Sequence, residues 1–377
     1  MTSVVRHKKH ANLEKPKLGH YSRNEVAILG APCPIIQQLA NQIAQSLEEM
    51  EVTFMDADHS VDQSMARFPG HLLTDKISHH RLDYAGTIND YDQKLELMDK
   101  PLVLINGNHF KAAQQIVILN SKKKESLSRK LDRLTNVRLI LTDDEETPFD
   151  FLQDHIPNLH DIPIGRLDDI NLISRLVRES VQIPPVFGLV LAGGDSRRMG
   201  KDKTKISYHD KPQAQFAFEI MDQLVERTFI SCKHGQEEKF SFTENYVLDT
   251  FTGLGPFGAV LSAFRKHPNH AWLVVATDQP LLGKEELERL IIKRDPAKFA
   301  TCYYNPETQF PEPLITLWEP GSYQRMLQFL SLGYSCPRKV LINSPIQMIE
   351  VSETSFMKNA NTPEEHDQLQ AMLASRS

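Results

Sequence analysis

The stretch LVLAGGDSRRMGKDK, residues 189–203, joins an apolar run to glycines and to a dense group of cations. Gly193 and Gly194 follow the apolar residues directly. A strand that ends in glycine exposes backbone N–H groups at the carboxyl edge of a parallel sheet, where such sheets bind ligands. Cationic side chains close by can offset the charge of a phosphate. The pattern predicts a nucleoside triphosphate site, with a solvated loop as the alternative interpretation. The cations are Arg197, Arg198, Lys201, Lys203 and Lys205.

Two aspartates follow later apolar runs, and the second of them is a further candidate for this site. Asp249 follows the run YVL, and Asp278 follows AWLVVAT. A carboxylate at a strand end beside a phosphate site is a hard oxygen ligand that suits Mg²⁺. Aspartate in such positions also forms ordinary turns and helix caps. The residue types therefore permit a metal site without requiring one.

The residues of the second half of the chain resemble one family of nucleotidyltransferases. LAGGDSRRMGKDK resembles the signature LAGGxSxRMGxDK of the molybdenum cofactor guanylyltransferases, the MobA family, and matches it at every fixed position. Four later segments resemble family motifs in the family's order, so the resemblance covers essentially residues 186–375. These segments are LDTFTGLGPFGAV, VVATDQPLL, PEPLITLW and FMKNANTPEE.

The resemblance implies roles for individual residues. It implies catalytic roles for Arg198, Lys203 and Asp278, with Asp278 as the ligand of a Mg²⁺ cofactor. It places Asn359 and Asn361 at the rim of the acceptor site, although asparagines before Thr-Pro-Glu also make good helix caps. The nucleotide-binding residues that it implies are Leu191, Ala192, Gly193, Gly194, Ser196, Lys203, Asp249 and Asp278.

The resemblance also implies a reaction. The terminal phosphate of molybdopterin, which carries the molybdenum, attacks the α-phosphorus of GTP and pyrophosphate leaves. Such transfer depends on positioning and charge neutralisation, so no nucleophilic side chain is needed. The expected partners are GTP and the molybdopterin cofactor, and molybdoenzymes or their chaperones are further candidates.

Two departures from the family pattern keep other functions open. Lys233 stands where the family usually has asparagine, and the DQP that begins at Asp278 is closer to the cytidylyltransferase relatives. Gly194 and Asp202 favour the guanylyl family. A cytidylyltransferase that uses CTP is therefore one alternative. A non-catalytic scaffold that carries the cofactor is another.

The first half of the chain contains a strand, a glycine turn and a helix, VAILGAPCPIIQQLANQIAQSL, but lacks the phosphate-binding residues of a P-loop. A Walker motif that starts at Gly30 needs glycine, lysine and a hydroxyl at positions 35–37, which hold Ile, Ile and Gln. Pro32 and Pro34 remove N–H donors. Residues 24–180, including PLVLINGNHFKAAQQIVILNSKKK, resemble the MobB family of P-loop adaptors. We expect a degenerate module that docks the transferase or a cofactor-handling partner.

Alternating apolar runs and amphipathic segments predict an α/β fold in both halves. We expect two Rossmann-like domains, because 377 residues exceed one typical core. Pro184 and Pro185 end a helical segment and mark the boundary. The expected parts are a disordered basic tail at 1–23, a MobB-like domain with a degenerate P-loop at 24–180, a linker at 181–186, and a nucleotidyltransferase domain at 187–377 whose fold resembles the nucleotide-diphospho-sugar transferases.

Composition excludes several classes of protein. A formal net charge of −6 is unlike that of a nucleic-acid binder. No apolar run approaches the roughly 20 residues that span a bilayer, and the basic N-terminus lacks the apolar core of a secretory signal. We therefore expect a cytoplasmic protein that binds neither nucleic acid nor membrane.

The cysteines and histidines do not form a standard metal motif. The four cysteines form no CxxC pair, which argues against a disulfide framework or a zinc site. DADHS and SHHRLD offer possible metal ligands, but their spacing fits no standard site. The residues concerned are Cys33, Cys232, Cys302 and Cys336, and Asp58, His59, His79 and His80.

Overall fold

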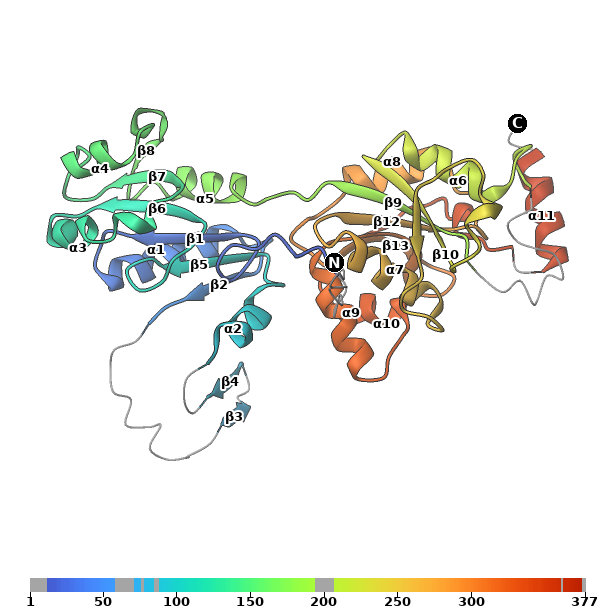
Figure 1. Ribbon diagram of the computed structural model, residues 1–377, viewed down its shortest axis with the longest axis horizontal. Helices are drawn as coiled ribbons and strands as arrows, with labels where there is room; N and C mark the ends of the chain where they lie inside the picture. Colours follow the sequence, from blue (N-terminus) through green and yellow to red (C-terminus); the bar gives the residue numbers. More distant parts are fainter. Residues whose placement is uncertain are drawn as a thin grey trace, which may run out of the picture. The chain divides into compact units, whose positions relative to one another are not determined.

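The computed structural model describes residues 12–57, 71–75, 78–84, 88–193, 207–360 and 362–374. The chain forms two compact units. The first unit is Leu18–Gln182, and the second is Ile183–Ser377 together with the described residues 12–17. Each unit contains a sheet with parallel strands and helices packed against it (Figure 1). The chain is therefore mixed α/β in both halves.

The first unit is built on a parallel sheet of six strands in the order β2-β5-β1-β6-β7-β8. Its central strands are buried throughout, as expected for a parallel sheet that is covered on both faces. The strands are β1 (Glu25–Leu29), β2 (Val52–Met55), β5 (Leu102–Asn106), β6 (Gln114–Leu119), β7 (Val137–Thr142) and β8 (Ile164–Arg166).

Helices cover both faces of this sheet. Apolar side chains of α1 (Cys33–Ser46) and α5 (Ile170–Glu179) share one core with inward residues of β1, β5, β6 and β7. Those of α3 (Lys124–Ser128) and α4 (Asp150–His155) form the core on the opposite face. A further helix, α2 (Asp90–Leu97), precedes β5 and has no buried residue. The unit therefore has three layers.

An antiparallel hairpin of β3 (Leu72–Asp75) and β4 (His80–Asp83) lies outside this sheet. It was not expected from the sequence, because its residues do not alternate between polar and apolar types. His80 is the first residue of β4, and its Nδ1 lies 3.1 Å from the Asp75 Oδ1. His79 directly precedes the strand. Asp58 and His59 lie outside the described residues.

Residues 12–23 differ from the expected disordered tail. The buried Glu25 carboxylate accepts the backbone N–H of His20 at 2.7 Å, which orders the chain before β1. Further upstream, the Asn269 side-chain amide donates to the Glu14 carboxylate at 2.8 Å. Without these hydrogen bonds, the His20 N–H and the Glu14 carboxylate would be bonded to water instead. The segment is therefore hydrogen-bonded in part to each unit.

The second unit is built on seven strands in the order β11-β10-β9-β12-β14-β13-β15. Strands β11, β10, β9 and β12 run parallel, whereas β14 is antiparallel to both of its neighbours. The strands are β9 (Val186–Leu191), β10 (Arg227–Cys232), β11 (Tyr246–Leu248), β12 (Ala271–Ala276), β13 (Ala300–Asn305), β14 (Phe310–Trp318) and β15 (Ile346–Ile349).

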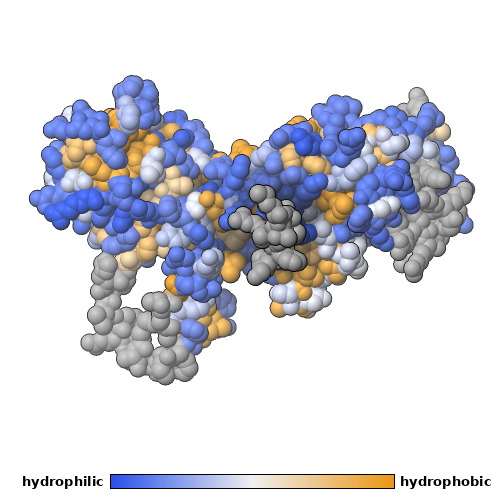
Figure 2. All heavy atoms as spheres, viewed as in Figure 1, coloured by the Kyte–Doolittle hydropathy of each residue, from blue (hydrophilic) through white to orange (hydrophobic). Residues whose placement is uncertain are grey.

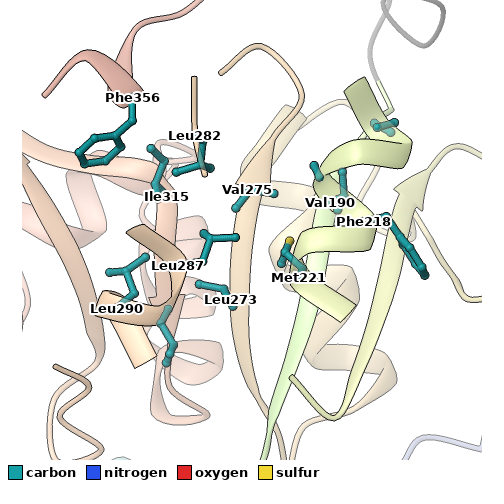
Figure 3. Packing of buried hydrophobic residues seen from close by; sticks show 14 of the residues in the cluster. Val190, Phe218, Met221, Leu273, Val275, Leu282, Leu287, Leu290, Ile315 and Phe356 are labelled. Carbon is teal, nitrogen blue, oxygen red and sulfur yellow. The ribbon is translucent and has the colours of Figure 1, made fainter. Parts of the chain in front are cut away.

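Alternate residues of the central strands point to two separate cores. Val190, Val275 and Ile315 pack with Met221 and Leu287 on one face (Figure 3). Residues at the intervening positions pack on the other face with α7 and α9. The helices of this unit are α6 (Gln213–Asp222), α7 (Gly255–Lys266), α8 (Lys284–Ile292), α9 (Gly321–Ser331), α10 (Pro337–Ile342) and α11 (Pro363–Ala374).

Polar residues cover most of the face shown in Figure 2. Apolar residues lie there in small groups, as on most globular proteins. In the part of the chain that the structure describes, no helix is both long enough and apolar enough to cross a membrane.

A buried ion pair fastens the start of the second unit. The Arg294 guanidinium donates to both oxygens of Glu319, at 2.6 and 2.7 Å, and also to the carbonyl of Pro184 at 2.8 Å. Both charged side chains are less than a tenth exposed. Removal of one partner from such a pair is strongly destabilising, because the remaining charge stays buried without its counter-charge.

Replacement of Glu319 by alanine should destabilise the second unit by about 3–5 kcal/mol, because Arg294 would remain buried without its counter-charge. Both tryptophans, Trp272 and Trp318, are fully buried in this unit, so urea unfolding followed by tryptophan fluorescence measures its stability. Glu288→Ala, which breaks the exposed Lys284–Glu288 pair, is the control and should cost under about 1 kcal/mol. Equal losses in the two variants would contradict this account.

Candidate functional site

The carboxyl ends of four parallel strands meet at one edge of the second unit's sheet. Leu191 at the end of β9 pairs with Ser231 of β10 and with Ala276 of β12. Cys232 pairs in turn with Leu248 at the end of β11. The residues that follow these strands therefore emerge at the same edge. Among them are three that the sequence predicts for the site: Gly193, Asp249 and Asp278.

Gly193 lies very close to the backbone of β10. A Cβ atom there would lie 3.2 Å from the Cα of Cys232 and 3.4 Å from the carbonyl oxygen of Ser231. The N–H groups of Ala192 and Gly193 both donate to that carbonyl, at 3.2 and 3.0 Å. The Gly193 N–H is thus engaged by the sheet instead of facing a ligand. The glycine is needed here for the close approach of two strands.

The rest of the glycine-rich, cationic segment lies outside the described residues. This holds for residues 194–206, including Gly194, Ser196, Arg198 and Lys203, and also for Asn361. Their roles stay predictions. The structure places the two ends of the segment, Gly193 after β9 and Ser207 before α6.

Asp249 is a half-buried carboxylate at the end of β11. Its N–H donates to the Cys232 carbonyl at 3.0 Å, and its Oδ1 accepts the Ser231 hydroxyl at 3.0 Å. Burial raises the pKa of Asp249, while the Ser231 hydrogen bond and the charge of Lys233 oppose that rise. Asp249 and Gly193 both contact the end of β10. The structure therefore brings these two predicted residues to the same place.

Asp278 follows β12 and is joined to the C-terminal part of the site. Its backbone carbonyl accepts the N–H of Ala360 at 2.8 Å, which holds the loop containing Asn359 beside it. The Thr277 hydroxyl donates to the Leu191 carbonyl at 3.4 Å and links the ends of β12 and β9. The structure therefore brings together Asp278 and Asn359, which are 81 residues apart in the chain.

Tyr208 belongs to this edge although it was not predicted from the sequence. Burial and the nearby Asp278 charge raise the pKa of Tyr208 to about 12. Its ring packs against His366 of α11, with 4.7 Å between ring centroids. Nothing in the sequence places this tyrosine at the site, because the residues around it come from distant parts of the chain.

Glu312 is the second residue that was not predicted. It lies near the start of β14, and because β14 runs antiparallel to β12, this start reaches the edge where β12 ends. Glu312 is only 4% exposed and accepts the Leu314 N–H at 3.3 Å. Burial raises its pKa; the Asp278 charge adds to the rise, and Arg338 opposes it. The presence of an acidic residue within an otherwise apolar strand could have indicated that Glu312 has a role at the site.

The donors at this edge suit Mg²⁺ shared with a substrate. Mg²⁺ is usually held by one or two carboxylates together with waters and substrate phosphates, and Asp278 and Glu312 supply two carboxylates. Within the described ranges, no group of three or more His, Cys, Asp or Glu residues is arranged to hold a metal ion by itself.

Comparison with known proteins finds a family similar to part of the second unit. Residues 188–345 match the family model of the MobA-like NTP transferase domain. This part of the chain is similar to that family, which is a family of enzymes.

Curated relatives are also similar to about half of the chain. Over 194 residues the chain is 32% identical to a "Molybdenum cofactor biosynthesis bifunctional protein" of Synechocystis, covering 51% of this chain and 56% of that protein. The chain thus spans little more than half of this relative. It is 29% identical to a "Molybdenum cofactor guanylyltransferase" of Shewanella halifaxensis, covering 50% of this chain and 96% of the relative.

A solved structure is also similar to part of the chain. The molybdopterin-guanine dinucleotide biosynthesis protein A of Archaeoglobus fulgidus is 22% identical, covers 50% of this chain and 99% of its own, and aligns with a TM-score of 0.44.

The raised pKa of Glu312 predicts a pH-dependent stability. A carboxyl whose pKa is higher in the folded state stabilises the fold below its ordinary pKa, and this contribution is lost as pH rises through the raised value. Glutamine has no charge to bury, so Glu312→Gln should gain stability relative to the wild type as pH rises from 4 to 7. Urea unfolding with tryptophan fluorescence measures the difference.

The control for this experiment is Glu288→Gln, which changes an exposed carboxylate of α8. Its stability difference from the wild type should not follow the same trend. The free energy of unfolding of Glu312→Gln relative to the wild type could instead stay constant with pH or fall as pH rises. Either result would contradict a raised pKa for the buried carboxyl of Glu312.

Proposed function

We propose that the second unit transfers GMP from GTP to molybdopterin-bound molybdenum cofactor. The guanine dinucleotide form of the cofactor and pyrophosphate are the products. The observation that carries this proposal is the convergence of Gly193, Asp249 and Asp278 at one sheet edge, within a unit that is similar to the MobA-like NTP transferase domain. Open α/β sheets bind ligands at that edge.

Two carboxylates would hold Mg²⁺ at the triphosphate. Asp278 would be the first ligand, and Glu312 lies close enough for the two charges to interact. A bound Mg²⁺ neutralises charge on the phosphates. Asn359 lies beside Asp278 and is suited to hydrogen-bond the acceptor. The chain positions its two substrates and needs no nucleophile of its own.

The cations of residues 194–206 and the end of β9 complete the proposed nucleotide site. Arg198 and Lys203 offset charge that builds on the α-phosphate and the leaving pyrophosphate. Asp249 serves the ribose or the base, because it lies at the end of β11 beside Gly193. Leu191, Ala192, Gly194 and Ser196 complete the nucleotide contacts, although Gly193 itself acts through strand packing.

Cytidylyl transfer with CTP is the second candidate. Two observations favour it: Lys233 stands beside Asp249 where the guanylyl family usually has asparagine, and Asp278 is followed by Gln279 and Pro280. A scaffold without catalysis is the candidate from another class. The retained carboxylates at the sheet edge argue against a scaffold, because carrying a cofactor would not require them.

The proposal for the first unit is a degenerate P-loop that serves docking. The Asn108 side chain fills the turn after β1: its Oδ1 accepts the Gly30 N–H at 3.5 Å and its Nδ2 donates to the Ala31 carbonyl at 2.8 Å. A P-loop presents such N–H groups to phosphate. Docking of the transferase or of a cofactor-handling partner therefore suits this unit better than nucleotide hydrolysis does.

Replacement of Asp278 by asparagine should reduce Mg²⁺-dependent formation of the guanine dinucleotide product by at least about 100-fold, because one carboxylate ligand is lost. Tryptophan fluorescence should report an unchanged fold. Asp222→Asn, which alters an exposed carboxylate at the end of α6, is the control and should retain the wild-type rate. A normal rate for Asp278→Asn at ordinary Mg²⁺ would remove Asp278 from the metal site.

Replacement of Lys203 by alanine should lower kcat by about 10²–10³-fold, because a charge-assisted contact to the transferred phosphate is lost. Lys205→Ala is the matched control, since it removes a cation of the same segment that is not a fixed position of the signature. Single-turnover rates with GTP measure both. Equal effects of the two variants would show that only the net charge of the segment matters.

A further inference from the structure

The first unit brings a thiol and an imidazole together at the carboxyl edge of its sheet. Cys33 begins α1 directly after the turn that follows β1, and His109 follows the neighbouring strand β5. The Cys33 Sγ lies 3.3 Å from the His109 Nε2. Both side chains are partly exposed. A thiol within hydrogen-bond reach of an imidazole is the arrangement of an activated cysteine nucleophile.

Polar groups surround the thiol. Cys33 is the first residue of a 14-residue helix, whose N-terminal end stabilises negative charge. The Asn108 side-chain amide lies 3.9 Å from the Sγ and is held in place by its bond to the Ala31 carbonyl. Lys130 donates to the Asn108 carbonyl at 2.9 Å. An imidazole, a side-chain amide and a helix N-terminus therefore lie beside this sulfur, and Lys130 is anchored to the same loop.

Lys130 and Arg133 make this edge cationic. The Arg133 guanidinium donates to the Gly107 carbonyl at 2.8 Å, so both cations are anchored to the loop that carries His109. Burial lowers the pKa of Lys130, and the neighbouring Arg133 adds to this, whereas Cys33 opposes the change. Because Lys130 and Arg133 are both anchored to the loop beside the thiol, a ligand with negative charge would be attracted there.

The other cysteines differ from Cys33. Cys232 and Cys302 are buried in the second unit, and burial raises the pKa of each thiol to about 12. Cys336 is exposed before α10. It therefore provides an accessible reference thiol within the same chain.

We propose that Cys33 and His109 form a nucleophilic pair that undergoes thiol–disulfide exchange with small anionic disulfides. The Cys33 sulfur attacks one sulfur of the disulfide, and its proton passes to the His109 Nε2. A bond forms between the Cys33 sulfur and the attacked sulfur, while the original S–S bond breaks. The second sulfur leaves with the electron pair as a thiolate. The disulfide is the only oxidant, and Cys33 becomes a mixed disulfide.

The experiment uses the full chain and two aromatic disulfides, one that carries two carboxylates and one neutral dipyridyl reagent. The reaction rate of Cys33 is measured in the Cys336→Ser variant, and that of Cys336 in the Cys33→Ser variant. Both rates are followed by release of the coloured aromatic thiol. Peptide mass mapping identifies the modified residue. Cys33 should react at least about tenfold faster than Cys336 with the anionic reagent. Equal or slower reaction of Cys33 would overturn the proposal.

The role of His109 is tested by His109→Gln in the Cys336→Ser background. The rate at Cys33 should fall about tenfold or more, because the proton acceptor is lost. His155→Gln, which changes an exposed histidine of α4, should leave the rate unchanged. Far-ultraviolet circular dichroism checks that both variants fold. An unchanged rate in folded His109→Gln would show that the imidazole does not act as the base.

The preference for anions is tested by Lys130→Gln. This variant should lower the ratio of the anionic to the neutral reagent's rate at Cys33, since a nearby cation is removed. Lys122→Gln, on the exposed turn after β6, is the control and should preserve the ratio. A ratio that Lys130→Gln leaves unchanged would overturn the anionic part of the proposal.

Discussion

The second unit depends on the parallel pairing of β9 with β10 on one side and β12 on the other. Leu191 lies opposite Ser231 and Ala276, so the three strands end level with one another. Apolar side chains pack on both faces of these strands, and a shift of one residue would turn each of them to the wrong face. The core therefore fixes the register, and the register places Gly193 and Asp278 at a common edge.

The two units use the same element, a strand that ends in a glycine turn, for different chemistry. In the second unit Gly193 allows two strands to approach, and the chain then enters the cationic signature. In the first unit the Asn108 side chain fills the turn after Gly30, and Cys33 stands where the helix begins. A parallel sheet offers the same edge in both cases. The side chains after the glycine decide what that edge can bind.

Much of the fold could be predicted from the sequence, because many elements are bounded by clear signals. The segments RTFISC and GPFGAVLSAFRK coincide with β10 and α7, since charged or turn residues flank both. The β3–β4 hairpin and α2 were missed because their exposed residues lack a regular apolar pattern. Within the site, Asp249 and Asp278 were found as strand-end carboxylates. Tyr208 and Glu312 were missed because their contacts arise from the path of distant segments.

We propose that the second unit transfers GMP to molybdopterin. The most direct test of this proposal is to incubate the purified full chain with Mg²⁺, molybdopterin cofactor and each nucleoside triphosphate in turn, and to identify the product by mass. The account predicts a dinucleotide product with GTP, together with one pyrophosphate for each product formed. A product that forms with CTP and not with GTP, or no product with any nucleotide, would contradict it.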